Sequence, residues 1–423
     1  MTREMERKRE AWVTGLGIVS SLGEGHDVHH QALMARAGPG PRIPVPHIDA
    51  STHAPYTVHP LADIDIDRLI PSKADRKQMG IWQRLGVHTA GLALQDANVA
   101  GHDDILDRMD LVVAAGNGER DEGFDTRVLE QLTSLKSSEA SVALNAALMS
   151  GLRPTLYLGE LSNLLAGNIQ IVHKVTGSSR TLKGEEISGL SAIEDATRRI
   201  NAGQAEIVLV GGAHNADRND LLLNYELGSS LWSHPYEPVW RRSNAGGGFV
   251  PGSAAAFLVI ESSEHALARG AKPYARIADV ACDRAQRGST HDIYDSLRRL
   301  AEKLTGEALC GSVGLLSGAS GAEPATSDER LFLNDWNNES GHQISARAYG
   351  SILGHTVEAH APLGVALACL ALDRREFFKP FEDDPVEQLE LVAPEQILVT
   401  SVGHWRGEGL ALLERITIEA RPK

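Results

Sequence analysis

The chain has 423 residues, of which 42% are hydrophobic and 23% charged, values that are ordinary for a folded globular protein. This length allows one large layered core or two domains of moderate size. The formal net charge of −15 argues against a nucleic-acid-binding function, because phosphate binding requires concentrated lysine and arginine.

The cysteines and the hydropathy pattern indicate the cellular compartment of the protein. Cys282, Cys310 and Cys369 are far apart and match neither a metal-binding nor a disulfide pattern, and their odd, low number suggests a reducing compartment. We expect no metal or other cofactor. No run approaches the roughly 18 apolar residues that a membrane span requires. The first ten residues are charged and lack the apolar stretch of a secretory signal. These features predict a cytoplasmic protein that does not contact a membrane.

In chain order, the first predicted elements are a buried strand and its glycine turn in Ala11–Gly23. Apolar residues at helical spacing predict a helix within Trp82–Ala100, and Leu111–Ala115 reads as a short buried strand. Residues 121–150 are predicted to be helical. Residues 232–252, which are rich in proline and glycine, are predicted to form a loop.

The segment from Thr181 to Gly212 predicts a complete strand–turn–helix–strand unit. Its first strand leads to two adjacent carboxylates, Glu185 and Glu186, and the helix that follows has apolar residues along one face. Gly203 ends the helix, and Ile207–Val210 is a buried strand. Enzymes with α/β folds often carry a nucleophile at such a helix N-terminus, so this turn is the first candidate site.

The second half repeats the alternation of strands and helices. After a connector at residues 262–276, an amphipathic helix is predicted at Ile293–Leu304 and a strand at Val313–Leu316. A helix at Pro362–Leu372 and a last strand at Gln396–Val402 complete the pattern. The alternation predicts an α/β protein with a seam between two similar halves.

The turn resembles the nucleophile segment of the β-ketoacyl synthases, the condensing enzymes of fatty-acid and polyketide synthesis, which have the thiolase fold. The family turn reads T-A-C-A-S-G, where this chain has G-E-E-I-S-G at Gly184–Gly189. The opening V-T-G-L-G-I-V-S-S-L-G at Val13–Gly23, the G-G-A at Gly211–Ala213 and the G-H pair at Gly354–His355 are also similar to family motifs.

This resemblance extends from Val13 to about Glu414 and implies a thiolase-like α/β fold. Two similar βαβ-type halves, residues 11–261 and 262–423, would form a layered αβαβα core. The resemblance also implies a dimer in which the strand before the nucleophile pairs across the two-fold axis. Residues 178–183 would then lie in the interface.

The family's catalytic set is incomplete in this chain. The nucleophilic cysteine falls on Glu186, and a carboxylate is a poor acyl acceptor because a mixed anhydride is far less stable than a thioester. The first family histidine, in H-G-T-G-T, is replaced by S-G-A-S-G-A at Ser317–Ala322, and no histidine occurs between His291 and His342. The second family histidine remains as His355.

Other family positions also differ. Ser253 replaces the glutamate of D-G-F-V-x-G-E-G-A, and Y-G-S at residues 349–351 stands where the family has a lysine. The closing G-F-G-G-x-N turn reads G-H-W-R-G-E at Gly403–Glu408. His360 and His404 could enlarge a polar pocket, although isolated histidines are more often structural.

These departures predict a catalytically silent homologue. In type II polyketide systems, with similar pairs in aryl-polyene pathways, an active ketosynthase pairs with a cysteine-free chain-length factor, or β subunit. That subunit usually carries glutamine at the nucleophile position, and this chain resembles it most in pattern. The resemblance implies a non-catalytic subunit for polyketide or fatty-acid-like elongation, with a cysteine-bearing ketosynthase and an acyl carrier protein as partners.

Two alternatives remain open. An enzyme with altered chemistry, such as a decarboxylase, hydrolase or acyltransferase, would use Glu186 as a base beside His355. A non-enzymatic homodimer that binds acyl chains or acts as a scaffold would need neither residue for chemistry.

Overall fold

The computed structural model describes residues 9–35, 47–151, 158–305, 309, 312–339, 343–388 and 391–417. Cys310 and residues 1–8 of the charged N-terminal segment lie outside these ranges. Among the described residues, no helix has both the length and the apolar character needed to cross a bilayer.

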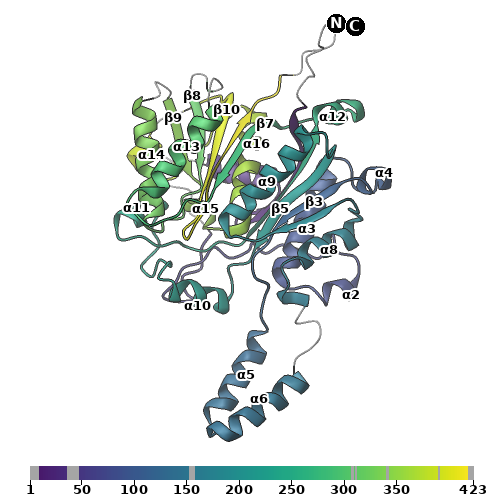
Figure 1. The fold of residues 1–423 in the computed structure, drawn as a ribbon, viewed down its shortest axis with the longest axis vertical. Coiled ribbons are helices and arrows are strands. Elements are labelled where there is room, and N and C mark those ends of the chain that lie inside the picture. The colour runs from purple at the N-terminus through teal and green to yellow at the C-terminus, as the bar shows by residue number, and fades with distance from the viewer. Residues whose placement is uncertain are drawn as a thin grey trace.

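A mixed sheet of eleven strands forms the centre of the molecule (Figure 1). The strands lie in the order β4-β3-β5-β6-β1-β7-β11-β10-β8-β9, and β2 pairs with β1 outside this path. Their bounds are β1 Ala11–Ser20, β2 Gly23–Glu24, β3 Asp110–Ala114, β4 Ser179–Leu182, β5 Ile207–His214, β6 Ala254–Ser262, β7 Ala275–Asp283, β8 Ser312–Ser317, β9 Gln343–Ala348, β10 Gln396–Val402 and β11 Glu408–Glu414.

The two halves of the sheet share one strand order. Counted from the outer edge inward, each half runs through its own third, second, fourth, fifth and first strand. The two first strands, β1 and β7, meet at the centre, where Ala11 pairs with Ile277 and Val13 with Ala275 in antiparallel register. This repetition confirms the predicted α/β, thiolase-like fold, and the division of the chain at residue 262 stays a prediction.

The helices cover the sheet in layers. Their bounds are α1 His26–Met34, α2 Lys73–Arg76, α3 Ile81–Asp96, α4 Asp103–Leu106, α5 Glu122–Thr133, α6 Ser137–Gly151, α8 Leu164–His173, α9 Glu186–Asn201, α10 Asn219–Leu227, α11 Val239–Asn244, α12 Ser263–Arg269, α13 Asp292–Thr305, α14 Ala325–Glu339, α15 Gly350–Leu353, α16 His360–Arg374 and the short 3₁₀ helices η1 Val357–Ala359 and η2 Pro385–Glu387.

Helices α9 and α16 form the central layer, because they contact each other and strands of both halves. Helix α16 is apolar on all sides and buried from His360 to Leu372, as expected of a helix enclosed on every side. Gly189 of α9 allows this close packing, since a Cβ there would lie 2.6 Å from the carbonyl oxygen of Glu358.

Residues alternate along β3 between two hydrophobic clusters. Val112 and Ala114 pack in the cluster that contains α9 and α16, whereas Leu111 and Val113 pack with α3 and α8 on the other face. Helices α13 and α14 cover the corresponding outer face of the C-terminal half. The two halves of the sheet therefore lie on either side of α9 and α16, with α3 and α8 outside one half and α13 and α14 outside the other. This is the predicted αβαβα layering.

One predicted loop was partly wrong. Residues 232–252 contain the short helix α11, which follows Pro238. Proline has a φ angle that suits a helix start, and tertiary packing then favours the helix because Trp240 and Arg242 are fully buried.

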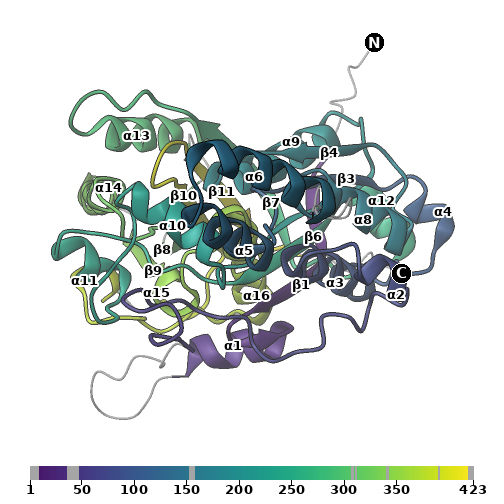
Figure 2. The same ribbon diagram turned by 90° about the horizontal axis from the view of Figure 1, so that it is seen from below.

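Helices α5 and α6 confirm the helical prediction for residues 121–150, but they do not pack into the layers. They form a hairpin that projects from the body in Figure 1 and lies across its lower face in Figure 2. Within α5 and α6 only Phe124 is buried. Leu129, Val142 and Met149 are 62%, 71% and 82% exposed.

Candidate functional site

Helix α9 begins at Glu186, directly after a tight turn that follows β4. Gly184 and Glu185 in this turn have positive φ angles of 152° and 56°. For a glutamate this backbone conformation costs about 1–3 kcal/mol, the kind of strain that concentrates at functional sites. The turn directs Glu186 into the interior, where the residue is 1% exposed, and the helix N-terminus favours its negative charge.

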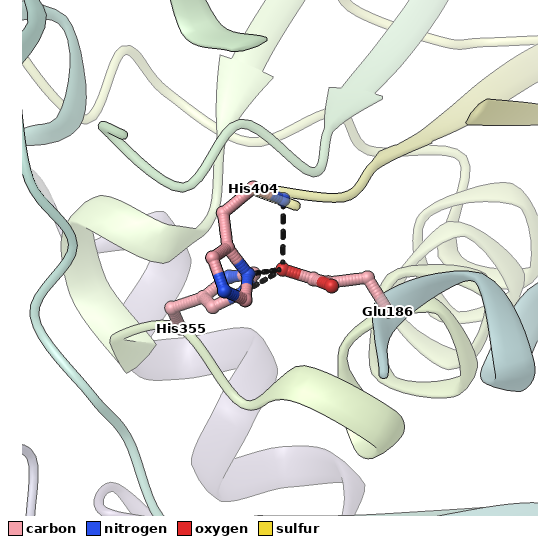
Figure 3. A group of neighbouring side chains, drawn as sticks. All are labelled: Glu186, His355 and His404. Carbon is pink, nitrogen blue, oxygen red and sulfur yellow. Dashed lines mark hydrogen bonds and ion pairs between the residues drawn. The ribbon is translucent and has the colours of Figure 1, made fainter. Parts of the chain in front are cut away.

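Three side chains from distant segments meet at this point (Figure 3). His355 lies between α15 and η1, and His404 lies in the turn between β10 and β11. Glu186 Oε1 accepts hydrogen bonds from His355 Nε2 at 2.7 Å, from His404 Nδ1 at 2.6 Å and from the His404 backbone N–H at 3.1 Å. The structure therefore joins the two predicted site residues, Glu186 and His355, and adds His404.

Glu186, His355 and His404 shift one another's pKa. Burial alone would raise the pKa of Glu186, but the charge of His404 and hydrogen bonds from both histidines outweigh it and hold this pKa well below its usual value. Burial opposes the charged form of His404, yet the Glu186 charge and hydrogen bond raise its pKa. Burial dominates at His355 and lowers its pKa. These shifts favour the ionised form of Glu186 and the charged form of His404, and they favour the neutral form of His355.

Aromatic rings hold the two imidazoles in place. The Phe249 ring centroid lies 5.0 Å from that of His355 and 5.1 Å from that of His404. His360 packs behind His355 with 4.6 Å between ring centroids. Burial lowers the pKa of His360 well below its usual value, so this histidine stays neutral. Of the two histidines expected to enlarge a polar pocket, His404 bonds to Glu186 and His360 is part of the packing.

The position of the missing histidine is occupied by a network of hydroxyl groups. Ser317, at the end of β8, donates a hydrogen bond to Glu329, and Thr400 donates a second one to the same oxygen. The backbone N–H of Gly318 donates to the Thr400 hydroxyl. Burial raises the pKa of Glu329 to about 7. This network supplies no imidazole in the place where the resemblance expects one.

Neither described cysteine can act as the nucleophile at this turn. Cys282 lies beside Glu194 and Ser191, about one to two turns further along α9 than Glu186, and burial raises the pKa of its thiol to about 12. Cys369 is fully buried within α16, and burial raises its pKa as well. Both thiols therefore remain protonated at neutral pH.

Comparison with known proteins now gives the family. The sequence profile described as "Beta-ketoacyl synthase, N-terminal domain" matches residues 8–266, which is more than half of the chain. The chain belongs to the β-ketoacyl synthase family. The 3-oxoacyl-(acyl-carrier-protein) synthase 2 of Vibrio cholerae is 25% identical over 275 residues, which are 64% of this chain and 62% of that protein. The alignment thus spans less than two thirds of this relative.

Other relatives and solved structures agree. The granaticin polyketide putative beta-ketoacyl synthase 2 of Streptomyces violaceoruber is 26% identical over 270 residues, 63% of this chain and 60% of that protein. The ishigamide ketosynthase/chain length factor shares the fold with a TM-score of 0.76 at 22% identity, covering 97% of this chain and 100% of that one. The AntDE:AntF complex of a type II ketosynthase with its acyl-carrier protein has a TM-score of 0.69 at 16% identity, with the same coverage of both chains.

In this family member a cavity of about 340 Å³ opens beside the substituted nucleophile. Its polar lining includes Lys183, Glu185, His214, Arg218, Glu358 and Arg406, and its apolar lining Trp82, Ala213, Leu221, Tyr225 and Trp405. His214 Nδ1 lies 3.2 Å from a Glu358 oxygen, and its Nε2 has no hydrogen-bond partner. This mixed lining is more polar than the predominantly hydrophobic walls that an apolar acyl chain favours.

Sequence reasoning missed His214 and Glu358. Glu358 was visible as part of H-T-V-E-A-H, three residues after His355, which is an unusually polar start for a buried helix. His214 ends β5 and had no comparable signal, because its pairing with Glu358 spans 144 positions of the chain.

Proposed function

We propose that this chain is a non-condensing ketosynthase subunit, similar in role to a chain-length factor, that pairs with a cysteine-bearing β-ketoacyl synthase. The supporting observation is the state of Glu186, which stands at the nucleophile position, is buried and bonds to both His355 and His404. It carries no sulfur for a thioester, and its lowered pKa keeps it an ionised acceptor of hydrogen bonds.

Two surface features support the pairing. Strand β4 lies at one edge of the sheet, and Ser179 and Arg180 at its start are exposed, so a second subunit can add to this edge. The hairpin of α5 and α6 projects from the same half and carries exposed apolar side chains. A partner that covers both would bury surface that this chain leaves in water.

The partner would supply the thiolate and the complete histidine set, and an acyl carrier protein would bring the growing chain to it in the cytoplasm. The ishigamide structure contains a ketosynthase/chain length factor, and the AntDE:AntF structure contains an acyl-carrier protein in complex with its ketosynthase; both share the fold of this chain. The charged cavity beside Glu186 fits this division of labour, because the acyl chain would lie on the partner's side.

An enzyme that uses Glu186 as a base beside His355 is less well supported. A general base needs a pKa near the working pH and access to a substrate proton. The pKa of Glu186 lies well below its ordinary value, and Oε1 already accepts three hydrogen bonds.

Co-expression with a cysteine-bearing ketosynthase encoded beside this chain tests the proposal. Malonyl-carrier and acyl-carrier substrates are supplied, and elongated products are measured by mass spectrometry. We expect elongation by the pair, none by this chain alone, and none when the partner's cysteine is changed to alanine. An isolated chain that acquires a covalent acyl group, or whose turnover stops in Glu186→Ala, would overturn the proposal.

A further inference from the structure

Glu186, His355 and His404 form a donor set that is common in metal centres. Each offers one ligand atom, and the three atoms lie within 4.8 Å of one another. Two imidazoles and one carboxylate are an established ligand set for Zn²⁺ and for other divalent transition metals. We propose that these three side chains bind one divalent transition-metal ion at the position where the family has its thiol. This inference is independent of the proposed function, because a non-condensing subunit neither requires nor excludes a bound metal ion.

The donors come from three segments that the fold brings together. Glu186 is in the first turn of α9, His355 follows α15, and His404 lies in the β10–β11 turn, 218 positions from Glu186. The cysteine spacing does not indicate this site, since its donors are imidazoles and a carboxylate that lie far apart along the chain. A metal ion here would link the central helix layer to two loops of the C-terminal half.

The distances are compatible with a bound ion after a small adjustment. The two ring nitrogens lie 2.7 and 2.6 Å from Glu186 Oε1. Bonds of about 2.0–2.1 Å to a tetrahedral ion would place neighbouring donors about 3.3 Å apart. A slight outward rotation of the two rings therefore opens enough space. All three side chains already point at one another in Figure 3.

An unpaired oxygen in the site also points to a ligand. Glu186 Oε2 is buried and has no hydrogen-bond partner, although Oε1 accepts three hydrogen bonds. It lies against Gly403, where a Cβ would come within 3.2 Å. Leaving a buried carboxylate oxygen unpaired is costly, and such groups are rare in folded proteins. A cation bound by both oxygens of the carboxylate would satisfy Oε2 as well.

The three donors lie close to the surface and are held in place by their surroundings. The His404 side chain is 6% exposed, and the next residue in its turn, Trp405, is 67% exposed, so the site lies directly beneath the surface at this turn. Phe249 packs against both imidazoles and fixes their planes. Glu185 lines the neighbouring cavity and places a second carboxyl group beside the three donors, although burial and the Glu186 charge raise its pKa.

Metal titration of the full-length chain tests this inference. After treatment with a chelator, Co²⁺ serves as a spectroscopic probe and Zn²⁺ is titrated by calorimetry. We expect one ion per chain, visible d–d absorption by bound Co²⁺, and a rise in Tm on adding Zn²⁺. Glu186→Gln and His404→Phe each remove one ligand, and each should weaken binding by at least about 100-fold, more than loss of an outer-sphere partner.

The variants and a control separate this site from adventitious binding. Glu186→Gln keeps the side-chain shape, and His404→Phe introduces the phenylalanine of the family turn, so at least one folded variant is expected. His53→Ala removes another imidazole–carboxylate pair, His53 with Asp217 at 2.6 Å, and should leave the stoichiometry at one. The inference is wrong if the chain shows no Co²⁺ absorption, or if both ligand variants bind the ion as tightly as the unchanged chain.

Discussion

The centre of the molecule and the α5–α6 hairpin are built in opposite ways. At the centre, α9 and α16 are enclosed by strands of both halves, and Glu186 finds its partners within the same chain. The hairpin makes its main helix–helix contact with itself and exposes Leu129, Val142 and Met149 to water. One chain is therefore enough to hold the centre in shape, whereas the hairpin leaves apolar surface in water that a second subunit would cover under the proposed function.

Elementary helix energetics support this conclusion. Helices α5 and α6 have 12 and 15 residues, and isolated helices of about that length are marginal in water. Most of the stability of protein helices comes from packing an apolar face, and only Phe124 of this hairpin is buried. We therefore expect the partner subunit to cover the hairpin.

The largest expected effect is on pairing. Replacing Leu129, Val142 and Met149 together by glutamate places three charges in the proposed interface. We expect binding to the ketosynthase partner to weaken by at least about 1,000-fold, since buried interface anchors contribute about 2 kcal/mol or more each. The stability of the isolated chain should change little, because these side chains are exposed. Sedimentation velocity of the co-purified pair measures the effect.

Leu267→Glu is the matched control for this change. Leu267 is 50% exposed on α12, at the end of the molecule opposite to the hairpin in Figure 1. Its substitution should leave pairing intact. A triple variant that still pairs with unchanged affinity would show that the hairpin is not part of the interface. The exposed apolar side chains of the hairpin would then have no role in pairing.

Substitutions at the centre should instead lower the stability of the isolated chain. Glu186→Ala removes the shared partner of His355 and His404 and leaves a cavity, so we expect a loss of about 4 kcal/mol in the free energy of unfolding. Glu186→Gln should lose less, because it keeps the volume and one hydrogen-bond acceptor. Urea unfolding in the presence of a chelator measures both without any contribution from metal. Equal stability of all three chains would show that the hydrogen bonds of Glu186 to His355 and His404 do not stabilise the fold.

The same contrast explains what could be predicted from the sequence. The turn at Glu186 and the histidine at 355 were identified because their motifs are local, and the repeated strand–helix alternation predicted the layered fold. The bond between Glu186 and His404 depends on how the β10–β11 turn folds back over α9, which no local pattern encodes. The projection of α5 and α6 was also not predicted, since helical periodicity does not reveal what covers a helix.

The smallest effect in this series concerns Glu329, a buried acid of the centre that bonds to Ser317 and Thr400. Burial raises its pKa from 4.5 to about 7. Between these two pH values the folded chain holds a proton that the unfolded chain has released. Its contribution to stability is therefore complete below pH 4.5 and is lost as the pH rises through about 7.

The shift corresponds to about 3 kcal/mol. Glu329→Gln should remove this pH dependence because the amide does not ionise. Urea unfolding of both chains at pH 5 and pH 8 isolates the effect, since the other acids titrate equally in the two proteins. We expect the free energy of unfolding of the variant, relative to that of the unchanged chain, to be higher at pH 8 than at pH 5. Parallel changes in the two chains would mean that Glu329 is charged in the folded state, and that the centre tolerates a buried charge which it does not pair.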